Sequence, residues 1–256
     1  MRLAGEIAIV TGSTSGLGKE IARVFAAEGA SVVVTGRDEQ RGRAVVADLT
    51  TAGGTAAFVR ADLSELAAAD ALVAATVERF GGVSVLVNNA VDDGSSGDGP
   101  LLDVDLADWE RKLRVNLTGA AWLCRAVLPH QIAAGHGSIV NVSSRAAERG
   151  TPGLAAYTAS KGGLNALTRS IAIDYASAGV RCNSVTPGYI LHEERDRDID
   201  DARRARVQGM HLTRLVTATD VALAVLFLAS DEAATITGID LPVSGGSTTA
   251  RGLTLG

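Results

Sequence analysis

The chain has 256 residues, which is enough for one large domain with a sizeable core. Hydrophobic residues make up 46% and charged residues 21%, a balance that excludes a disordered chain or a coiled coil. The formal net charge of −5 argues against a nucleic-acid backbone as the main partner. The longest apolar run, Val221–Ala229, is far shorter than the roughly 20 residues that span a bilayer, and the N-terminus shows no signal peptide. We therefore expect a cytoplasmic protein that has no membrane or nucleic-acid partner.

Cysteines and histidines give no sign of a metal site. The two cysteines, Cys124 and Cys182, have neither disulfide nor metal-ligand spacing, and we expect both to be buried thiols. The four histidines form no cluster in the sequence. We predict no metal.

Short β-rich runs alternate along the chain with longer helical stretches. The predicted strands are Ile7–Val10, Ser31–Thr35, Ala56–Val59, Val83–Val87, Ser138–Val142 and Val180–Val185. The predicted helices between them are Gly18–Glu28, Asp38–Thr51, Glu65–Phe80, Asn116–Ala133 and Ala155–Ala178. The strands are too apolar to alternate between core and solvent, as expected when both faces of a sheet are covered. The rhythm predicts an α/β fold in a single domain, residues 1–256, with a doubly wound, mostly parallel sheet of about seven strands and helices on both faces.

Two segments interrupt this rhythm. Residues 92–100 form a turn-rich stretch directly after the fourth strand. Glu193–Arg206 is dense in interleaved acids and arginines, and it has two interpretations. It is either a solvated helix or, as part of residues 189–213, a mobile lid over a substrate pocket at the carboxyl edge of the sheet.

A glycine-rich turn joins the first strand to the first helix. In Thr11–Gly18 the glycines 12, 16 and 18 follow the spacing G-x-x-x-G-x-G. They allow a tight turn and the close approach of a pyrophosphate, while the helix N-terminus supplies free N–H groups and a positive dipole end. A glycine-rich turn alone is weak evidence, but its place between strand and helix favours dinucleotide binding.

Two later positions have a cofactor interpretation and a plainer one. Asp62 follows the third strand, where its carboxylate either accepts a hydrogen bond from an adenine amino group or caps the next helix. Asn88-Asn89-Ala90 ends the fourth strand, where its backbone either contacts a cofactor ribose or simply forms a turn.

Tyr157 and Lys161 carry the strongest chemical signal. They lie four residues apart in a predicted helix and therefore share one face. Because the chain has only three tyrosines and few lysines, a chance pair at this spacing is rare. A free tyrosine titrates near pH ~10, and a nearby ammonium lowers that pKa toward the working range of a general base.

Hydroxyl and amide side chains accompany this pair. Ser143 and Ser144 end the fifth strand, where a hydroxyl can donate to a substrate carbonyl oxygen as negative charge develops on it. Asn116 either holds a water in a proton relay or caps a helix, and the residues alone favour the cap.

Taken together, the chain closely resembles the short-chain dehydrogenase/reductase family over almost its whole length. The matching residues stand in family order: Thr11–Gly18, Asp62, Asn88-Asn89-Ala90, Asn116, Ser144, Tyr157, Lys161 and Pro187-Gly188. Ser144 precedes Tyr157 by the usual 13 positions, which selects it over Ser143. The ordered set is far more specific than any one motif.

The resemblance implies an NAD(P)-dependent oxidoreductase that interconverts a secondary alcohol and a carbonyl by hydride transfer. Tyr157 would be the general acid/base, Lys161 would lower its pKa and bind the nicotinamide ribose, Ser144 would polarise the substrate oxygen, and Asn116 would complete a water relay. The implied cofactor contacts are Gly12, Ser13, Thr14, Ser15, Gly16, Leu17, Gly18, Arg37, Asp62, Leu63, Asn89, Ala90, Tyr157, Lys161, Pro187, Gly188 and Ile190. The family also implies a small alcohol or carbonyl substrate and a homotetramer that pairs helices 116–133 and 155–178, with small residues such as Gly162 and Gly163 permitting close packing.

The end of the second strand bears on cofactor choice. NAD-preferring relatives usually carry an aspartate at the position of Gly36, and its absence removes the group that repels a 2′-phosphate. Arg37 can pair with that phosphate, although it also fits a solvated turn. Against this, Ser15 adds no basic charge, and Asp38 offers an acidic ribose partner. We favour NADP(H) and keep NAD(H) as the alternative.

Three departures from the family pattern leave every catalytic group in place. Val91 stands where glycine is usual, which puts the local turn in question because a β-branched residue resists positive φ. His192 replaces a common threonine, and Ser244 a frequent aspartate. Two other functions stay open at this point: a non-catalytic nucleotide-binding redox sensor, and a dehydratase or epimerase on the same fold.

Overall fold

The structure, a computed structural model, describes residues 1–92, 97–191, 196 and 198–249. Its strands are β1 (Ile7–Thr11), β2 (Ser31–Gly36), β3 (Thr55–Arg60), β4 (Val85–Asn88), β5 (Gly137–Val142), β6 (Val180–Pro187) and β7 (Asp240–Val243). Its longer helices are α1 (Gly16–Ala27), α2 (Glu39–Thr51), α3 (Ala67–Phe80), α4 (Leu106–Leu113), α5 (Ala120–Ala134), α6 (Ala155–Tyr175), α7 (Asp201–Gly209) and α8 (Ala218–Ala229).

The strands form one seven-stranded sheet in the order β3-β2-β1-β4-β5-β6-β7, and every pair is parallel. The strand order reverses between β1 and β4, where Val10 pairs with Val87. In open parallel sheets, ligands bind outside the carboxyl ends of the strands at this reversal. The predicted single, doubly wound α/β sheet is confirmed, and its strand order is that of a Rossmann fold.

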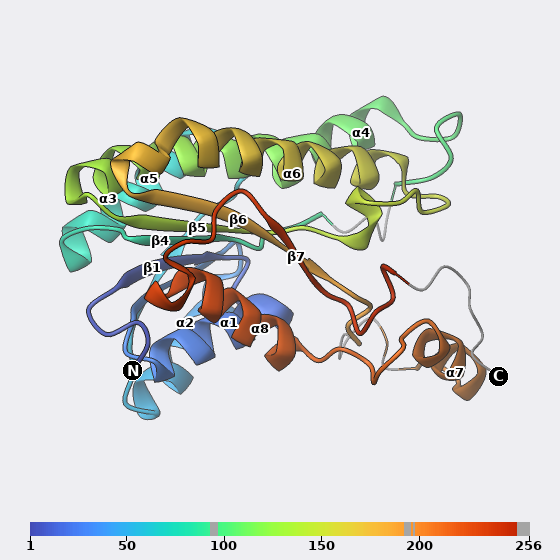
Figure 1. Ribbon diagram of the computed structural model, residues 1–256, viewed down its shortest axis with the longest axis horizontal. Helices are drawn as coiled ribbons and strands as arrows, with labels where there is room; N and C mark the ends of the chain where they lie inside the picture. Colours follow the sequence, from blue (N-terminus) through green and yellow to red (C-terminus); the bar gives the residue numbers. More distant parts are fainter. Residues whose placement is uncertain (93–96, 192–195, 197, 250–256) are drawn as a thin grey trace.

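Each strand sends alternate side chains to opposite faces, and both faces are buried. One core contains Val10, Val34 and Val87 and is covered by α1, α2 and α8. The other contains Ile9, Leu86 and Ile139 and is covered by α3, α5 and α6. Figure 1 shows these two helical layers on either side of the sheet. Burial on both faces explains why the strand sequences are continuously apolar.

The predicted helix Asn116–Ala133 begins too late. Helical structure starts ten residues earlier, at Leu106, because the carboxylate of Asp105 accepts a hydrogen bond from Ala107 N at 2.8 Å and caps α4. A π-helical segment, Arg114–Gly119, then joins α4 to α5. Asn116 therefore lies inside a continuous helical run and does not cap it.

Other predicted boundaries differ by a few residues. Helix α1 starts at Gly16 and not at Gly18. Asp38 is the N-cap of α2 and not its first residue, and α6 ends at Tyr175 before a short 3₁₀ turn. The seventh strand, expected by number but not located in the sequence, is β7, which pairs with β6 at the edge of the sheet.

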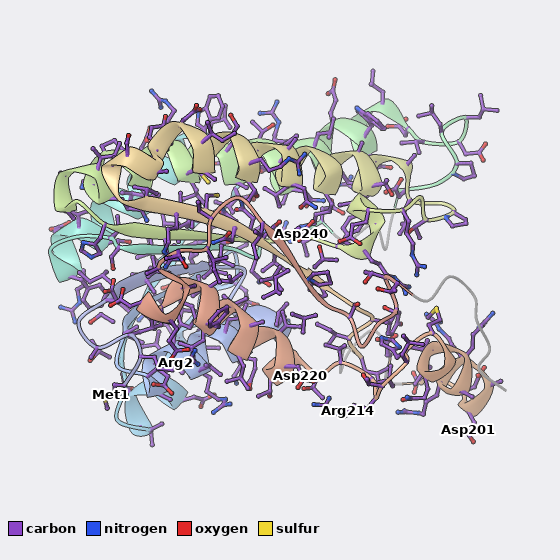
Figure 2. All side chains as sticks on the ribbon, in the orientation of Figure 1. Met1, Arg2, Asp201, Arg214, Asp220 and Asp240 are labelled. Carbon is purple, nitrogen blue, oxygen red and sulfur yellow. The ribbon has the colours of Figure 1, made fainter. Side chains whose placement is uncertain are left out.

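The segment after β6 leaves the sheet and returns through α8. Helix α7 stands apart from the two layers (Figure 1), and Val207 is its buried residue. Arg214 and Asp220, labelled in Figure 2, form a two-pronged ion pair at the start of α8 with N–O distances of 2.6 Å. That bond, with help from Thr217, holds the pKa of Asp220 well below its usual range. Part of the predicted lid, residues 192–195 and 197, lies outside the described residues, and its role stays a prediction.

No helix among the described residues is long and apolar enough to cross a membrane.

Candidate active site

A cleft of about 730 Å³ opens at the carboxyl edge of the sheet, where the strand order reverses. Most of the predicted site residues line it, including three of the four predicted catalytic residues. They are Gly12, Thr14, Ser15, Gly16, Leu17, Gly18, Arg37, Asp62, Leu63, Asn89, Ala90, Ser144, Tyr157, Lys161, Pro187 and Gly188. The structure thus brings the glycine-rich turn and the Tyr157–Lys161 pair to one continuous surface.

The glycine-rich turn is as tight as its sequence predicts. Gly12 and Gly16 have φ values of 63° and 52°, in the left-handed region that favours glycine. A Cβ atom on Gly18 would lie 2.3 Å from the carbonyl oxygen of Gly12, so only glycine fits there. Ser15, the N-cap of α1, makes no side-chain capping bond, which leaves the first N–H groups of the helix for a ligand.

Thr11 and Asn89 fix this turn against the neighbouring strand. The Thr11 hydroxyl accepts hydrogen bonds from the backbone N–H groups of Asn89 and Ala90 at 2.8 and 2.9 Å. The Asn89 side chain donates to the carbonyl oxygen of Thr11 at 2.9 Å. The sequence pointed to Asn89 as a cofactor contact, and its side-chain amide holds the glycine-rich turn. The role of Thr11 had no signal beyond its place before Gly12.

The far end of the cleft carries Arg37 and Asp62. Asp62 accepts hydrogen bonds from the Ser64 backbone N–H at 3.0 Å and the Ser64 hydroxyl at 2.8 Å. These bonds, with the positive charges of Arg37 and Arg60, lower the pKa of Asp62. Asp62 therefore forms a local turn with Ser64 and lines the cleft. It does not cap α3, whose N-cap residue is Leu66, so its plainer interpretation as a helix cap is wrong.

The residues around Gly36 determine which charged side chain from the end of β2 lies at the Arg37 end of the cleft. A Cβ atom on Gly36 would lie 2.8 Å from Cγ2 of Thr14. The Thr14 side chain therefore fills the space that a side chain at position 36 would need. Asp38 caps α2 by accepting a hydrogen bond from Arg41 N at 3.0 Å, and it is not part of the cleft lining. Arg37 is exposed, lines the cleft and forms no ion pair with any described residue.

Lys161 is buried beneath Tyr157. Its side chain is 2% exposed, and Nζ donates a hydrogen bond to the carbonyl oxygen of Val142, at the end of β5, at 2.8 Å. Burial lowers the pKa of Lys161 to about 8. The ammonium lies 5.9 Å from the centre of the Tyr157 ring, which confirms that the two side chains share one face of α6.

Asn116 does not line the cleft but supports its wall. The Asn116 amide accepts a hydrogen bond from Asp92 N at 2.7 Å and donates to Asp92 O at 2.9 Å. It also donates to the hydroxyl of Ser160 on α6 at 3.1 Å. Asn116 thus ties the chain that follows β4 to the helix of Tyr157.

Ser144 and Ser143 end β5 at the cleft. The Ser144 oxygen accepts a hydrogen bond from Ala146 N at 3.2 Å, which leaves its hydroxyl hydrogen to donate elsewhere. The buried hydroxyl of Ser143 has no hydrogen-bond partner among the described residues. Both line the cleft, so geometry alone does not separate them.

The first turn of α6 is capped from another segment. Leu154, its N-cap residue, has no side-chain capping bond. The carboxylate of Asp98 instead accepts hydrogen bonds from Ala156 N at 3.1 Å and Tyr157 N at 2.9 Å. This remote cap attaches the segment after β4 to the backbone of Tyr157 itself.

Two predicted cofactor contacts lie away from the cleft lining. The Ser13 hydroxyl donates to Val10 O at 2.6 Å and accepts from Thr35 N at 3.0 Å, so it joins β1 to β2. Ile190 forms a β-bridge with Val216. The Ser13 side chain and the Ile190 backbone therefore make contacts within the scaffold around the cleft.

The departures from the family pattern are accommodated locally. Among the described residues every positive φ belongs to a glycine, so Val91 needs no strained turn. Ser244 is buried, and its hydroxyl lies 3.0 Å from the hydroxyl oxygen of Thr248. His192 lies outside the described residues.

The burial of Lys161 predicts a specific dependence of stability on pH. Because its pKa falls from 10.5 to about 8 on folding, the unfolded chain binds more protons between these values. The free energy of unfolding therefore rises with pH across this window, and the cost of the buried charge is fully present below it. We predict that Lys161→Met is about 1–2 kcal/mol more stable than wild type at pH 7 and that this gap narrows toward pH 10.

Denaturant unfolding of both proteins without cofactor, at pH 7 and at pH 9.5, measures the difference in their free energies of unfolding. If that difference is the same at both pH values, the pKa of Lys161 is not lowered by folding.

Comparisons with known proteins place the chain among dehydrogenases and reductases. A family model described as enoyl-(acyl carrier protein) reductase matches residues 12–248. A 2,5-dichloro-2,5-cyclohexadiene-1,4-diol dehydrogenase of Sphingobium indicum is 36% identical over 245 residues, which cover 96% of this chain and 97% of the relative. A 3beta-hydroxysteroid dehydrogenase 1 of Eggerthella lenta is 39% identical over 259 residues, covering 99% and 98%.

Solved structures agree with these sequence matches. A gluconate 5-dehydrogenase from Burkholderia cenocepacia J2315, in complex with NADP and tartrate, has a TM-score of 0.91 to this chain at 33% identity. The match covers 97% of each chain. Since sequence and fold match along nearly the whole length, the chain belongs to the short-chain dehydrogenase/reductase family of oxidoreductases.

Proposed function

We propose that this oxidoreductase uses NADP(H) to interconvert a secondary alcohol and a carbonyl compound, with Tyr157 as general acid/base. The observation that carries the proposal is the single cleft that joins the glycine-rich turn to Ser144, Tyr157 and Lys161. A nucleotide site and a proton-transfer site on one surface suit hydride transfer between a bound cofactor and a small substrate.

The chain's own residues fit a nicotinamide dinucleotide. The free N–H groups at the start of α1 suit the pyrophosphate. The absence of a Cβ at Gly12 lets the glycine-rich turn pack directly against Ala90, which lines the same cleft. Arg37 and Asp62 would hold the adenosine end, while Lys161, Pro187 and Gly188 would hold the nicotinamide end. When bound, the cofactor supplies a two-electron hydride acceptor or donor.

Proton transfer falls to Tyr157. In oxidation the alcohol loses its hydroxyl proton to the Tyr157 phenolate as its carbon loses a hydride, and a carbonyl results; reduction reverses both transfers. The cationic form of Lys161 favours the phenolate through space, since opposite charges lower the pKa of a phenol. The Ser144 hydroxyl donates to the substrate oxygen and stabilises the charge that develops there.

Loss of the Tyr157 hydroxyl tests this role. Tyr157→Phe removes the proton-transfer group and leaves the nucleotide turn untouched, so turnover should nearly vanish while the Kd for NADP(H) stays almost constant. Steady-state kinetics with a carbonyl panel and a fluorescence titration of cofactor measure the two effects. If Tyr157→Phe keeps most of its activity, the mechanism is wrong. If wild type binds cofactor tightly but turns over no compound, a redox sensor becomes the better assignment.

The proposed preference for NADP(H) rests on charge at the far end of the cleft. Arg37 has no ion-pair partner among the described residues, Gly36 contributes no carboxylate, and Asp38 is engaged in capping α2. A 2′-phosphate would therefore meet an available guanidinium and no nearby acid from this strand end. An arginine–phosphate pair is charge-assisted and can be bidentate, which favours NADP over NAD.

Arg37→Ala should lower kcat/KM for NADP about tenfold or more and leave kcat/KM for NAD nearly unchanged. Arg43→Ala is the matched control, because Arg43 is an exposed arginine on α2 that pairs with Glu39 and does not line the cleft. It should change neither value by more than about twofold. Equal losses for both cofactors in Arg37→Ala, or a wild-type preference for NAD, would refute the assignment.

We also propose a homotetramer built through α5 and α6. Trp122 and Ile132 on α5 and Ile173 on α6 are exposed, with Ile173 80% accessible. A Cβ on Gly162 would meet nothing within 4 Å, so this position leaves room for a partner helix, whereas Gly163 is covered by Leu117 of its own chain. Exposed apolar side chains on neighbouring helices are typical of a subunit interface.

Light scattering at micromolar concentration should therefore give four times the 26.2 kDa chain mass. Ile173→Glu should lower that mass, because it places a charge in the apolar contact. A monomeric mass for the wild-type protein would contradict the proposal.

A further inference from the structure

The first three N–H groups of α6 are capped by residues 98 and 99, which belong to the segment after β4. The two carboxylate oxygens of Asp98 accept from different residues, Oδ1 from Ala156 N at 3.1 Å and Oδ2 from Tyr157 N at 2.9 Å. The carbonyl oxygen of Gly99 accepts from Ala155 N at 3.3 Å. An asparagine at position 98 would offer only one acceptor oxygen, so the full cap requires a carboxylate.

The Asp98 carboxylate also places a negative charge close to the Tyr157 phenol. Because Oδ2 lies 2.9 Å from Tyr157 N, bond lengths alone keep the phenol oxygen within about 11 Å of it. The N-terminus of a helix carries a partial charge of roughly +0.5, which favours a phenolate nearby, and a full carboxylate charge outweighs it. Asp98 is half-buried, so water screens this charge only in part.

Tyr157 therefore lies between two opposite charges. The Lys161 ammonium, 5.9 Å from the centre of the ring, favours the phenolate. The Asp98 carboxylate at the start of the same helix favours the neutral phenol, since like charges repel. The protonation of Tyr157 depends on the balance of the two.

Other charged and titratable side chains lie on α6, on the elements packed against it and on the segments beside them. Those that the structure describes are Asp92, Asp108, Glu110, Arg111, Lys112, Arg114, Arg125, His130, Arg145, Glu148, Arg149, Arg169, Asp174, Tyr175 and Arg181. They stay the same in every variant used below, so a difference between two variants reports the substituted residue.

We propose that Asp98 is a positioning residue for Tyr157, whose negative charge keeps the phenol protonated to a higher pH than Lys161 alone would allow. This rests on the proposed role of Tyr157 as general acid/base. In reduction the phenol gives its proton to the substrate oxygen as the substrate carbon receives a hydride from the cofactor. In oxidation the phenolate accepts that proton. Asp98 thus extends the pH range in which the site reduces a carbonyl and moves oxidation to higher pH.

A purely structural cap is the competing explanation. Asp98 would then only fasten the segment after β4 to α6, and its replacement would lower the melting temperature without changing the ionisation of Tyr157. The two explanations differ in whether that ionisation follows the charge at position 98.

Spectrophotometric titration of the cofactor-free protein separates them without requiring turnover. The chain has only three tyrosines, so the tyrosinate absorbance of each protein minus that of its Tyr157→Phe counterpart gives the titration midpoint of Tyr157. Asp98→Asn removes the charge and one acceptor oxygen, whereas Asp98→Glu keeps the charge and disturbs the cap. Asp105→Asn is the matched control, because Asp105 is the carboxylate that caps the neighbouring helix α4.

We expect the midpoint to fall by about 0.5–1 pH unit in Asp98→Asn and to stay within about 0.3 unit of wild type in Asp98→Glu and Asp105→Asn. Lys161→Met should raise the midpoint, in the opposite direction to Asp98→Asn. Both substitutions at position 98 should lower the melting temperature, so stability follows the geometry of the cap and the midpoint follows its charge.

The pH profile of turnover gives the second readout, with any secondary alcohol of the substrate panel that wild type oxidises. The acidic limb of kcat/KM for oxidation should move to lower pH in Asp98→Asn by the same amount as the midpoint. The Kd for NADP(H) should stay within about twofold of wild type, because the nucleotide turn is unchanged.

Three outcomes would overturn this inference. They are an equal midpoint in wild type and Asp98→Asn, including no ionisation of Tyr157 in either protein up to the highest pH at which both stay folded; equal shifts in Asp98→Asn and Asp98→Glu; and equal shifts in Asp98→Asn and Asp105→Asn. If Asp98→Asn moves the midpoint but Tyr157→Phe keeps its turnover, the proposed function is wrong and the influence of Asp98 on the phenol stands.

Discussion

The hydrogen bond from the Lys161 ammonium to the Val142 carbonyl connects the fold to the chemistry. It fastens α6 to the end of β5, a central strand covered on both faces. An ammonium buried this deeply costs stability, and one carbonyl oxygen only partly offsets the lost water. The same charge lies beneath the Tyr157 ring, where it would favour the phenolate in the proposed mechanism. The hydrophobic cores on both faces of the sheet stabilise the fold and offset the free-energy cost of burying the Lys161 ammonium.

The carboxyl edge of the sheet brings together groups that are far apart in the chain. Thr11 at the end of β1 and Asn89 after β4 are nearly 80 residues apart, yet their hydrogen bonds hold the glycine-rich turn in place. Asn116 and Asp98 then link the chain after β4 to α6. Parallel strands with right-handed crossovers place all their carboxyl ends at one edge. The geometry of the site is therefore a consequence of the topology.

Local patterns in the sequence predicted the fold, the glycine-rich turn and the Tyr157–Lys161 face, because each depends on spacing within one strand or helix. The early start of α4 was missed, since its cap, Asp105, lies in a polar stretch without strand or helix periodicity. The roles of Asn116 and Asp98 were also missed, because their partners come from distant segments.

The remote cap on α6 has a consequence for how new substrate ranges evolve. Asp98 fixes one point of the segment between β4 and α4 to the backbone of Tyr157. Insertions and deletions on either side of that point can change the segment while the anchor keeps Tyr157, the proposed proton-transfer residue, in place. This segment can therefore change its sequence and length without moving Tyr157. A library that randomises this stretch around an invariant Asp98 would explore new pockets on an unchanged reaction centre.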